Sequence, residues 1–251
     1  CRDDIKKTAV KVRHFGLIGY PLTHSFSPDY FKNKFESLGV EDADYKLFEV
    51  NDLDSVKKLI ITYDLLGFNI TIPHKQSIIP YLDELTPEAN AIGSVNCVKV
   101  VEGKLIGYNT DEFGFRTSLT RLIGDKKVEK ALVLGNGGSS KAVQFALRQL
   151  KIDFSVVSRS GDLNYNNLSP SMIRTCQLII NTTPLGLFPK VDEFPNIPYE
   201  AIIGSHFAFD LIYNPSETAF MRKCSLGGAQ VKNGQEMLEL QADRSWEIWN
   251  A

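Results

Sequence analysis

Short apolar runs alternate with longer amphipathic stretches along this chain, a pattern typical of parallel strands connected by helices. In the first half, strands are expected over residues 15–19, 45–50 and 67–72, and a hairpin over 95–109 with its turn at Glu102–Gly103. Helices are expected after Pro28, over 56–61, over 77–85 with an interruption at Pro80, and over 111–122. The pattern therefore predicts an α/β fold.

The second half begins afresh after a charged stretch, 125–130, which is a candidate seam between two domains. An apolar run at 131–135 is followed by a glycine-rich turn, a helix over 141–150 and a strand over 153–158, which together form one βαβ unit. Further strands are expected over 177–181 and 206–213, and a last helix over 234–249. The pattern of this half predicts a second parallel sheet.

The charge balance and the cysteine content argue against several classes of function. The 251 residues carry 28 Lys+Arg against 30 Asp+Glu, so bulk electrostatics does not favour a nucleic-acid partner. Cys1, Cys97, Cys176 and Cys224 form no CxxC pair and have no neighbouring histidine cluster, so we expect reduced thiols and no metal site. No apolar run approaches the roughly 20 residues of a membrane span, so we expect a soluble, cytoplasmic protein.

The glycine-rich turn consists of Gly135, Asn136, Gly137, Gly138, Ser139 and Ser140. It follows an expected strand and opens an expected helix, which is the context of a dinucleotide-binding fingerprint. Gly135 permits the tight turn, Gly137 lets the backbone approach a pyrophosphate at the helix N-terminus, and the small Ser140 permits close packing. The alternative is a glycine-rich loop without a ligand.

The end of the following strand indicates which dinucleotide is bound. NAD sites and S-adenosylmethionine sites usually place an acid there, whereas this chain has Ser158, Arg159 and Ser160, with no acid before Asp162. An arginine can hold a phosphate in a forked geometry, which favours NADP over NAD and argues against a methyltransferase. The alternative for Arg159 is a solvated surface side chain.

Polar residues cluster at the expected strand ends of the first half, and each has a structural explanation of its own. Ser25 and Ser27 precede Pro28, and Ser27 is a natural helix N-cap. Asn69, Thr71 and Lys75 surround the end of the third strand, and Asn96 stands in a presumed strand where it needs a partner. One residue of 109–111 is expected to cap the following helix in any protein.

Taken together, these clusters resemble the successive signatures of the shikimate dehydrogenase family. The matching segments are 19–28 (including His24), 69–75, 93–96, 109–111, 135–140, 181–186, 210–215 and 233–238. They occur in order from about residue 15 to 249. The resemblance implies a substrate-binding and catalytic domain with a mostly parallel sheet at 15–110 plus 223–251, and a Rossmann-like NADP-binding domain at 111–222. It further implies that the site lies in the cleft between these domains.

The family implies the reversible NADPH-dependent reduction of 3-dehydroshikimate to shikimate, in aromatic amino-acid biosynthesis, by a monomer or homodimer. By resemblance, Lys75 and Asp111 form the catalytic pair. The implied substrate-binding residues are Ser25, Ser27, Asn69, Thr71, Asn96, Tyr213 and Gln241. The implied cofactor-binding residues are Gly135, Asn136, Gly137, Gly138, Ser139, Ser158, Arg159, Asn181, Thr182, Thr183 and Gly234.

Three positions depart from the family pattern. His74 stands where an aromatic residue is common, Glu236 replaces a more usual small residue, and no second basic residue follows Arg159 closely. Two alternative functions stay open from sequence alone. One is a related dehydrogenase that accepts quinate with NAD, and the other is a cofactor-binding regulatory protein that has lost catalysis.

Overall fold

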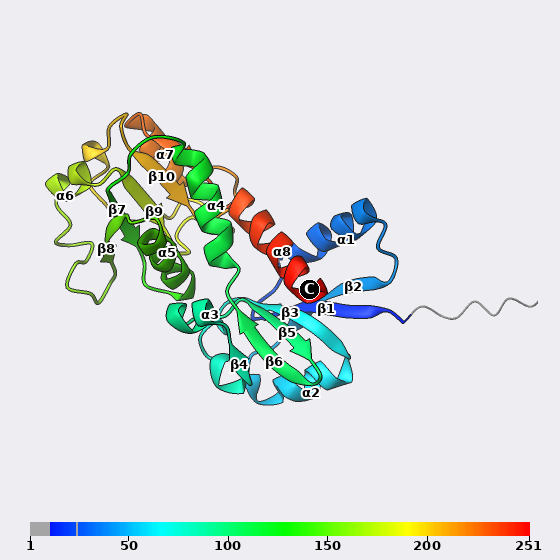
Figure 1. Ribbon diagram of the computed structural model, residues 1–251. Helices are drawn as coiled ribbons and strands as arrows, with labels where there is room; N and C mark the ends of the chain where they lie inside the picture. Colours follow the sequence, from blue (N-terminus) through cyan, green and yellow to red (C-terminus); the bar gives the residue numbers. More distant parts are fainter. Residues whose placement is uncertain (1–10, 24) are drawn as a thin grey trace, which may run out of the picture. The chain divides into compact units, whose positions relative to one another are not determined.

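The computed structural model describes residues 11–23 and 25–251, so that Cys1 and His24 lie outside the described residues (Figure 1). The chain divides into two compact units. Unit 1 comprises the chain up to Leu85, then Val95–Tyr108 and Ala251. Unit 2 comprises Thr86–Ser94 and Asn109–Asn250. Among the described residues, no helix combines the length and the apolar character that crossing a membrane requires.

Unit 1 is built on a six-stranded sheet with the order β2-β1-β3-β5-β6-β4. Its strands are β1 (Arg13–Gly19), β2 (Ala43–Glu49), β3 (Leu65–Ile70), β4 (Glu84–Leu85), β5 (Cys97–Val101) and β6 (Lys104–Tyr108). The helical elements are α1 (Ser27–Leu38), α2 (Val56–Thr62) and the short 3₁₀ turns η1 (Leu53–Ser55) and η2 (Ile79–Tyr81). β1 lies parallel to both β2 and β3, and the β5–β6 hairpin adds antiparallel pairs to this core.

The hairpin turn forms where the sequence predicts it. Glu102 and Gly103 both have positive φ, 51° and 80°, as a two-residue hairpin turn of the type with two left-handed residues requires. The expected helix over 77–85 is wrong. η2 and β4 replace it, because Pro80 removes a backbone donor and Asp83 pairs with Leu105 of β6 in both directions, N–H to carbonyl and N–H to carboxylate.

Unit 2 contains a five-stranded parallel sheet with the order β11-β10-β9-β7-β8. The strands are β7 (Lys130–Leu134), β8 (Asp153–Val157), β9 (Leu178–Asn181), β10 (Phe207–Asp210) and β11 (Gln230–Lys232). The helical elements are α3 (Pro87–Ile92), α4 (Asp111–Ile123), α5 (Gly138–Gln149), α6 (Pro170–Thr175), η3 (Tyr199–Ala201), α7 (Ala219–Leu226) and α8 (Gln235–Asn250). This is the predicted Rossmann-like arrangement.

Two apolar cores cover the opposite faces of this sheet. One includes Phe115 of α4 and Val143 of α5, and the other includes Ile173 of α6 and Phe220 of α7. Strands buried on both faces read as continuous apolar runs, which explains why β7, β9 and β10 were recognisable in the sequence. The fold is therefore α/β with mostly parallel sheets, as expected.

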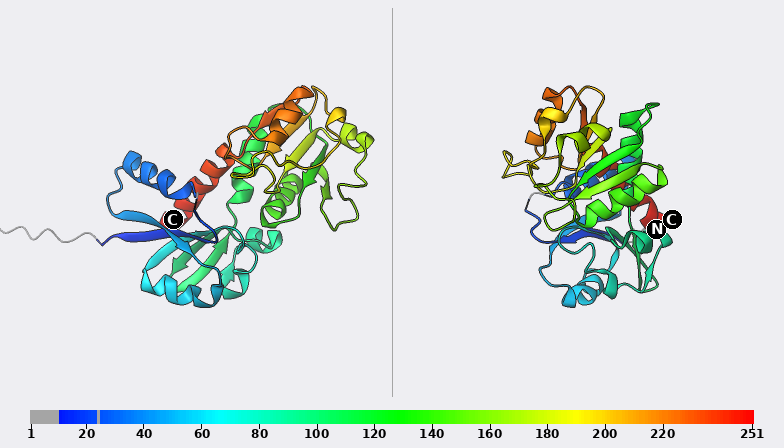
Figure 2. Two further views of the ribbon diagram at one scale, coloured as in Figure 1. Left: turned by 180° about the vertical axis from the view of Figure 1, so that it is seen from behind. Right: turned by 90° about the vertical axis from the view of Figure 1, so that its left-hand side faces the viewer.

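The charged stretch 125–130 is not a seam, because it lies within unit 2, where it follows α4 and ends on the first residue of β7. Helix α8 packs against α4 in the same unit, and the two helices lie side by side in Figure 1 and in the left view of Figure 2. Gly114 makes this approach possible, since a methyl group placed on it would lie 2.5 Å from the Met237 carbonyl oxygen. Packing thus groups 223–250 with unit 2, whereas their membership of the substrate-binding domain stays a prediction.

Candidate functional site

The glycine-rich turn of unit 2 follows β7 and opens α5, as the sequence predicts. Gly135 has a φ of 108°, and a side chain there would lie 2.7 Å from the Thr182 hydroxyl. The buried Ser140 hydroxyl donates a hydrogen bond of 2.8 Å to the Gly135 carbonyl, which holds the helix against the turn. Gly135 is therefore required by conformation and by packing, and Ser140 fits the third position of the fingerprint.

At position 137, neither the backbone conformation nor the packing requires a glycine. Its φ is −87°, an ordinary value, and a methyl group placed on it would meet no described atom within 4 Å. The backbone is open at the place where the N–H groups of the first turn of α5 begin. Such an open backbone at the N-terminus of a 12-residue helix fits an anionic group such as a pyrophosphate.

Arg159 lies at the carboxyl end of β8, which is the parallel neighbour of β7, so it shares this sheet edge with the turn. The loop folds back after it, because the Ser158 N–H donates to the Leu163 carbonyl at 3.2 Å. Arg159 and Ser160 are exposed. Burial raises the pKa of nearby Tyr165, and the Arg159 charge partly offsets that rise. The Arg159 guanidinium, which can donate two parallel hydrogen bonds to a phosphate, is therefore exposed at this edge of the sheet.

Asn181, Thr182 and Thr183 follow β9 at the same edge, and the protein itself uses their side chains. The Asn181 amide donates to an Asp210 carboxylate oxygen at 3.0 Å, and its carbonyl oxygen accepts from the Thr183 N–H at 3.0 Å and hydroxyl at 2.7 Å. The Thr182 hydroxyl donates to the Leu134 carbonyl at 2.7 Å. These side chains shape the loop beside Gly135, so any contact from this loop to a cofactor falls mainly to its backbone.

Asp210 is a member of the same cluster that sequence analysis did not select. It is fully buried at the end of β10, where it accepts from the Thr218 hydroxyl at 2.6 Å and the Ile212 N–H at 3.0 Å. Burial raises the pKa of this carboxyl group to about 6, against the opposing effect of these hydrogen bonds. An acid at the end of a wholly apolar strand was the available signal.

Tyr213 and Gly234 lie on the adjoining loop and at the start of α8. The Gly234 N–H donates to the Ile212 carbonyl at 2.9 Å, and a methyl group on Gly234 would lie 2.1 Å from the Leu211 carbonyl oxygen. Gly234 is therefore fixed by close backbone packing. Tyr213 is half-buried beside it.

Asp111 is the first residue of α4, and the residue before it, Thr110, makes a buried contact with α8. Asp111 is 5% exposed and Gln241 is 8% exposed. The Thr110 hydroxyl donates to the Gln241 amide oxygen at 3.4 Å and lies 3.2 Å from the Ser245 hydroxyl. The expected helix cap is Asn109, whose amide oxygen accepts from the Glu112 N–H at 3.1 Å. Thr110, the residue before the predicted Asp111, thus contacts the predicted Gln241 at the junction of these helices.

In unit 1, the predicted asparagines lie buried at the ends of β3 and β5. The Tyr45 hydroxyl donates to the Asn69 amide oxygen at 2.9 Å, and the Asn69 amide donates to the Asn96 carbonyl at 3.1 Å. Asn96 also supplies its carbonyl to the Ile70 N–H at 2.9 Å. Burial raises the pKa of Tyr45 well above its ordinary value, although the Ser27 hydroxyl acts in the opposite direction. Tyr45 was not predicted, because its partner Asn69 is 24 residues away.

Ser25, Ser27, Thr71 and Lys75 are half-buried at the carboxyl ends of the neighbouring strands β1 and β3. Thr71 joins these strands, since its N–H donates to the Ile18 carbonyl at 3.0 Å. The Lys75 carbonyl accepts from the Val95 N–H at 2.7 Å, which anchors the Lys75 backbone. The predicted residues of unit 1 therefore gather at one sheet edge.

Two expectations for this edge need correction. Ser27 is not the N-cap of α1, because the helix already includes it and its flanking residue Phe26 makes no side-chain cap; instead, the Ser25 hydroxyl oxygen accepts from the Ser27 N–H at 3.4 Å. β3 ends at Ile70 and not at residue 72. His74 is buried with Nε2 at 2.5 Å from the Val50 carbonyl, so it ties two loops together.

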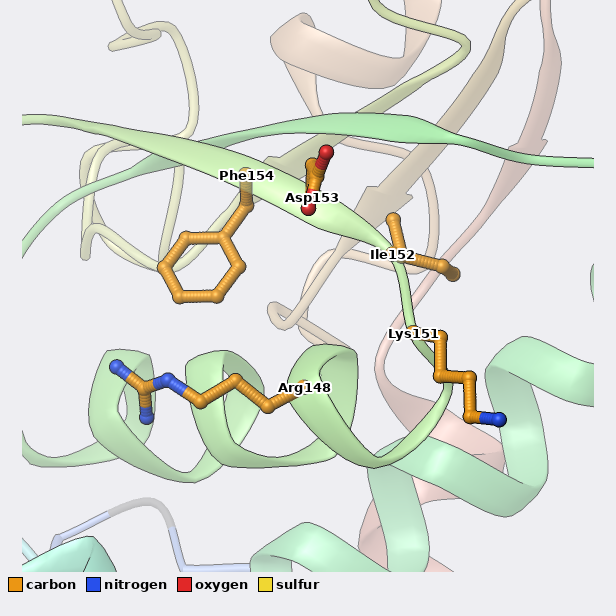
Figure 3. A pocket seen from close by; sticks show the side chains of 5 residues that line it. All are labelled: Arg148, Lys151, Ile152, Asp153 and Phe154. Carbon is orange, nitrogen blue, oxygen red and sulfur yellow. The ribbon is translucent and has the colours of Figure 1, made fainter.

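A depression of about 460 Å³ on unit 2 contains none of these residues. Arg148, Lys151, Ile152, Asp153 and Phe154 line it, and the Arg148 guanidinium lies 5.2 Å from the centre of the Phe154 ring. Figure 3 shows the Lys151 side chain pointing away from the Arg148–Phe154 pair. The side chains do not converge on one point, so this depression does not resemble a catalytic site.

Comparison with known proteins agrees with these observations. The family model described as "Shikimate dehydrogenase substrate binding domain" matches residues 17–98. The shikimate dehydrogenase (NADP(+)) of Methanococcus maripaludis strain C7 is 37% identical over 259 residues, covering 95% of this chain and 91% of the relative. The chain belongs to the shikimate dehydrogenase family. The resemblance found in the motifs is thereby confirmed.

Solved structures of shikimate dehydrogenases extend the likeness to the whole fold. The Aquifex aeolicus enzyme matches with a TM-score of 0.87 at 34% identity, covering 95% of this chain and 92% of that one. The Thermus thermophilus shikimate 5-dehydrogenase, solved in complex with NADP(H) and shikimate, matches with a TM-score of 0.85 at 32% identity, covering 95% and 93%. The family likeness therefore spans both units.

Proposed function

We propose that this protein catalyses the reversible NADPH-dependent reduction of 3-dehydroshikimate to shikimate, a step of aromatic amino-acid biosynthesis. The observation that carries the proposal is the joint presence, in a member of this family, of the open turn at Gly137, Arg159 at the adjacent strand end, and both Lys75 and Asp111. Relatives that share 35–38% identity are named as NADP(+)-dependent shikimate dehydrogenases. We further propose that it acts in the cytoplasm, as a monomer or homodimer.

The turn at Gly135–Ser140 fits the dinucleotide. The open backbone of Gly137 and the first turn of α5 would hold the pyrophosphate, and Arg159 with Ser158 would hold a ribose phosphate. When bound, NADPH supplies the hydride. The loop of Asn181–Thr183 and Gly234 would complete this binding region through the backbone that their packing positions.

The catalytic task of the protein's own side chains would be the transfer of one proton. Hydride delivery to the substrate carbonyl produces an alkoxide, and the Lys75 ammonium would stabilise and protonate that oxygen. Asp111 would hold Lys75 charged and orient it, because a nearby carboxylate favours the ammonium form. Ser25, Ser27, Asn69, Thr71, Asn96, Tyr213 and Gln241 would bind or position the hydroxyl and carboxylate groups of the substrate.

A steady-state comparison of shikimate and quinate, each with NADP and NAD, tests the proposal on the purified protein. We expect the highest kcat/KM for shikimate with NADP. A preference for quinate with NAD would identify the related dehydrogenase instead. Binding of NADPH without oxidation of shikimate at alkaline pH would identify a catalytically silent homologue.

A further inference from the structure

Glu236, one of the departures from the family pattern, lies in the first turn of α8 and is bound by two other elements. Its carboxylate accepts a hydrogen bond of 2.6 Å from the Ser118 hydroxyl and one of 2.7 Å from the Arg121 guanidinium, both on α4. Lys232 of β11 pairs with the same carboxylate and also donates to the Ser118 carbonyl at 3.1 Å. A single side chain thus joins α8, α4 and β11.

The cluster is held by charge as well as by geometry. Partial burial opposes ionisation of Glu236, but the hydrogen bonds from Lys232, Ser118 and Arg121 outweigh it and lower the pKa to about 2. The Glu236 side chain is 30% exposed and the Lys232 side chain is 22% exposed, so water screens this pair less than a fully exposed pair.

C-terminal to Glu236, helix α8 continues in close contact with α4. A methyl group placed on Gly114 would lie 2.5 Å from the Met237 carbonyl oxygen and 3.2 Å from the Gln241 backbone nitrogen. One turn earlier on α4, Thr110 contacts Gln241 and Ser245. Contacts that begin at Glu236 therefore end at the residue next to Asp111 and at the Gln241 amide.

We infer that Glu236 is a positioning residue: its bonds to Ser118, Arg121 and Lys232 fix how α8 lies on α4, and so fix the Gln241 amide beside the start of α4. The inference rests on the proposed function, in which Gln241 binds the substrate. A small residue at position 236 could make none of these bonds. In this chain, these bonds of Glu236 hold the first turn of α8 against α4.

The test compares Glu236→Gln, which keeps the shape of the side chain and removes its charge, with Glu247→Gln as the matched control. Glu247 lies on the same helix and pairs with Arg244, with both side chains about half exposed. For Glu236→Gln we expect a KM for shikimate raised about tenfold, with kcat and the KM for NADP nearly unchanged. Lys232→Met should raise the same KM by a smaller factor, because Ser118 and Arg121 still hold the carboxylate.

A second measurement does not depend on activity. Both tryptophans of the chain, Trp246 and Trp249, lie on α8, so their emission reports this helix alone. We expect a red shift or stronger acrylamide quenching in Glu236→Gln relative to the wild type. If the two variants have the same shikimate KM, or if Glu236→Gln has the Trp emission and quenching of the wild type, the inference is wrong. If the wild type fails to oxidise shikimate, the proposed function fails, and the emission result alone decides the role of Glu236.

Discussion

The two units place a buried asparagine at equivalent points, the carboxyl end of a strand inside a sheet, yet differ in what stands beside it. Asn69 is the last residue but one of β3 in unit 1, bound to Tyr45 and the Asn96 carbonyl, and Asn181 ends β9 of unit 2, bound to Asp210 and Thr183. In both units the amide holds loops together. A polar residue at a strand end can therefore support the fold without itself carrying the chemistry.

The groups next to these supports are of different kinds. In unit 1 the candidate chemistry belongs to a side chain, the Lys75 ammonium, on a backbone anchored by the Val95 N–H. In unit 2 it belongs to the backbone of the turn around Gly137, which no described atom crowds. Removing atoms from Lys75 should thus impair function in unit 1, whereas adding atoms to the turn at Gly137 should impair it in unit 2.

Lys75→Ala is the largest expected effect on the unit 1 side of this contrast. Removing the ammonium should lower kcat for shikimate oxidation by about 10²- to 10⁴-fold, the usual contribution of a positioned acid or base. NADPH affinity, measured by fluorescence titration, should stay unchanged. Equal loss of cofactor binding would contradict the assigned role.

Lys104→Ala is the matched control for that variant. Lys104 is an exposed lysine of unit 1 that pairs only loosely with Glu84, at 3.3 Å. Its replacement should leave both kcat and NADPH affinity at the wild-type values. A loss of kcat here as large as in Lys75→Ala would mean that overall charge, and not the position of Lys75, matters.

The sequence was most informative where a local rule decides the structure. The hairpin at Glu102–Gly103 needs two positive φ values, and the turn at Gly135 needs one residue without a side chain, so both appear directly in residue type. The expected helix over 77–85 failed because Asp83 pairs with Leu105, a contact that 22 positions separate. Local pattern carries no information about such a partner.

The residues of the candidate site also differ in how far the sequence alone could reveal them. Residues of the glycine-rich turn, Lys75 and Asp111 stood in recognisable motifs, whereas the supporting residue Tyr45 stood in none, and Asp210 stood in the matched segment 210–215 without being selected as a site residue. Tyr45 resembles any aromatic residue of a strand until the fold brings it to Asn69. The supporting role of Asp210 shows only in its burial and its hydrogen bonds, which follow from the strands and helices packed around β10.

Two alanine substitutions in the turn should separate conformation from ligand approach. Gly137→Ala places a methyl group in open space at an ordinary φ, so the melting temperature should hold while the Kd for NADPH rises about tenfold or more. Gly135→Ala forces a side chain onto a φ of 108° and against Thr182, so it should destabilise the fold by about 1–3 kcal/mol.

Thermal unfolding and NADPH titration of both variants, side by side, check this pair. The comparison fails if Gly137→Ala melts early, since the turn would then need that glycine for its own structure. It fails equally if Gly137→Ala binds NADPH as the wild type does, because the open backbone would then have no part in holding the pyrophosphate.

The smallest expected effect concerns Arg159 and the choice between the two nicotinamide cofactors. No lysine or arginine follows it before Arg174, so Arg159 alone would carry the recognition of the extra phosphate at the end of β8. Arg159→Gln should therefore raise the KM for NADP about tenfold and leave the KM for NAD unchanged. Arg174→Gln, which removes an exposed arginine of α6, should change neither. If Arg159→Gln raised both KM values equally, Arg159 would serve binding of the dinucleotide in general, and the preference for NADP would have to arise from the shape of the loop and not from its charge.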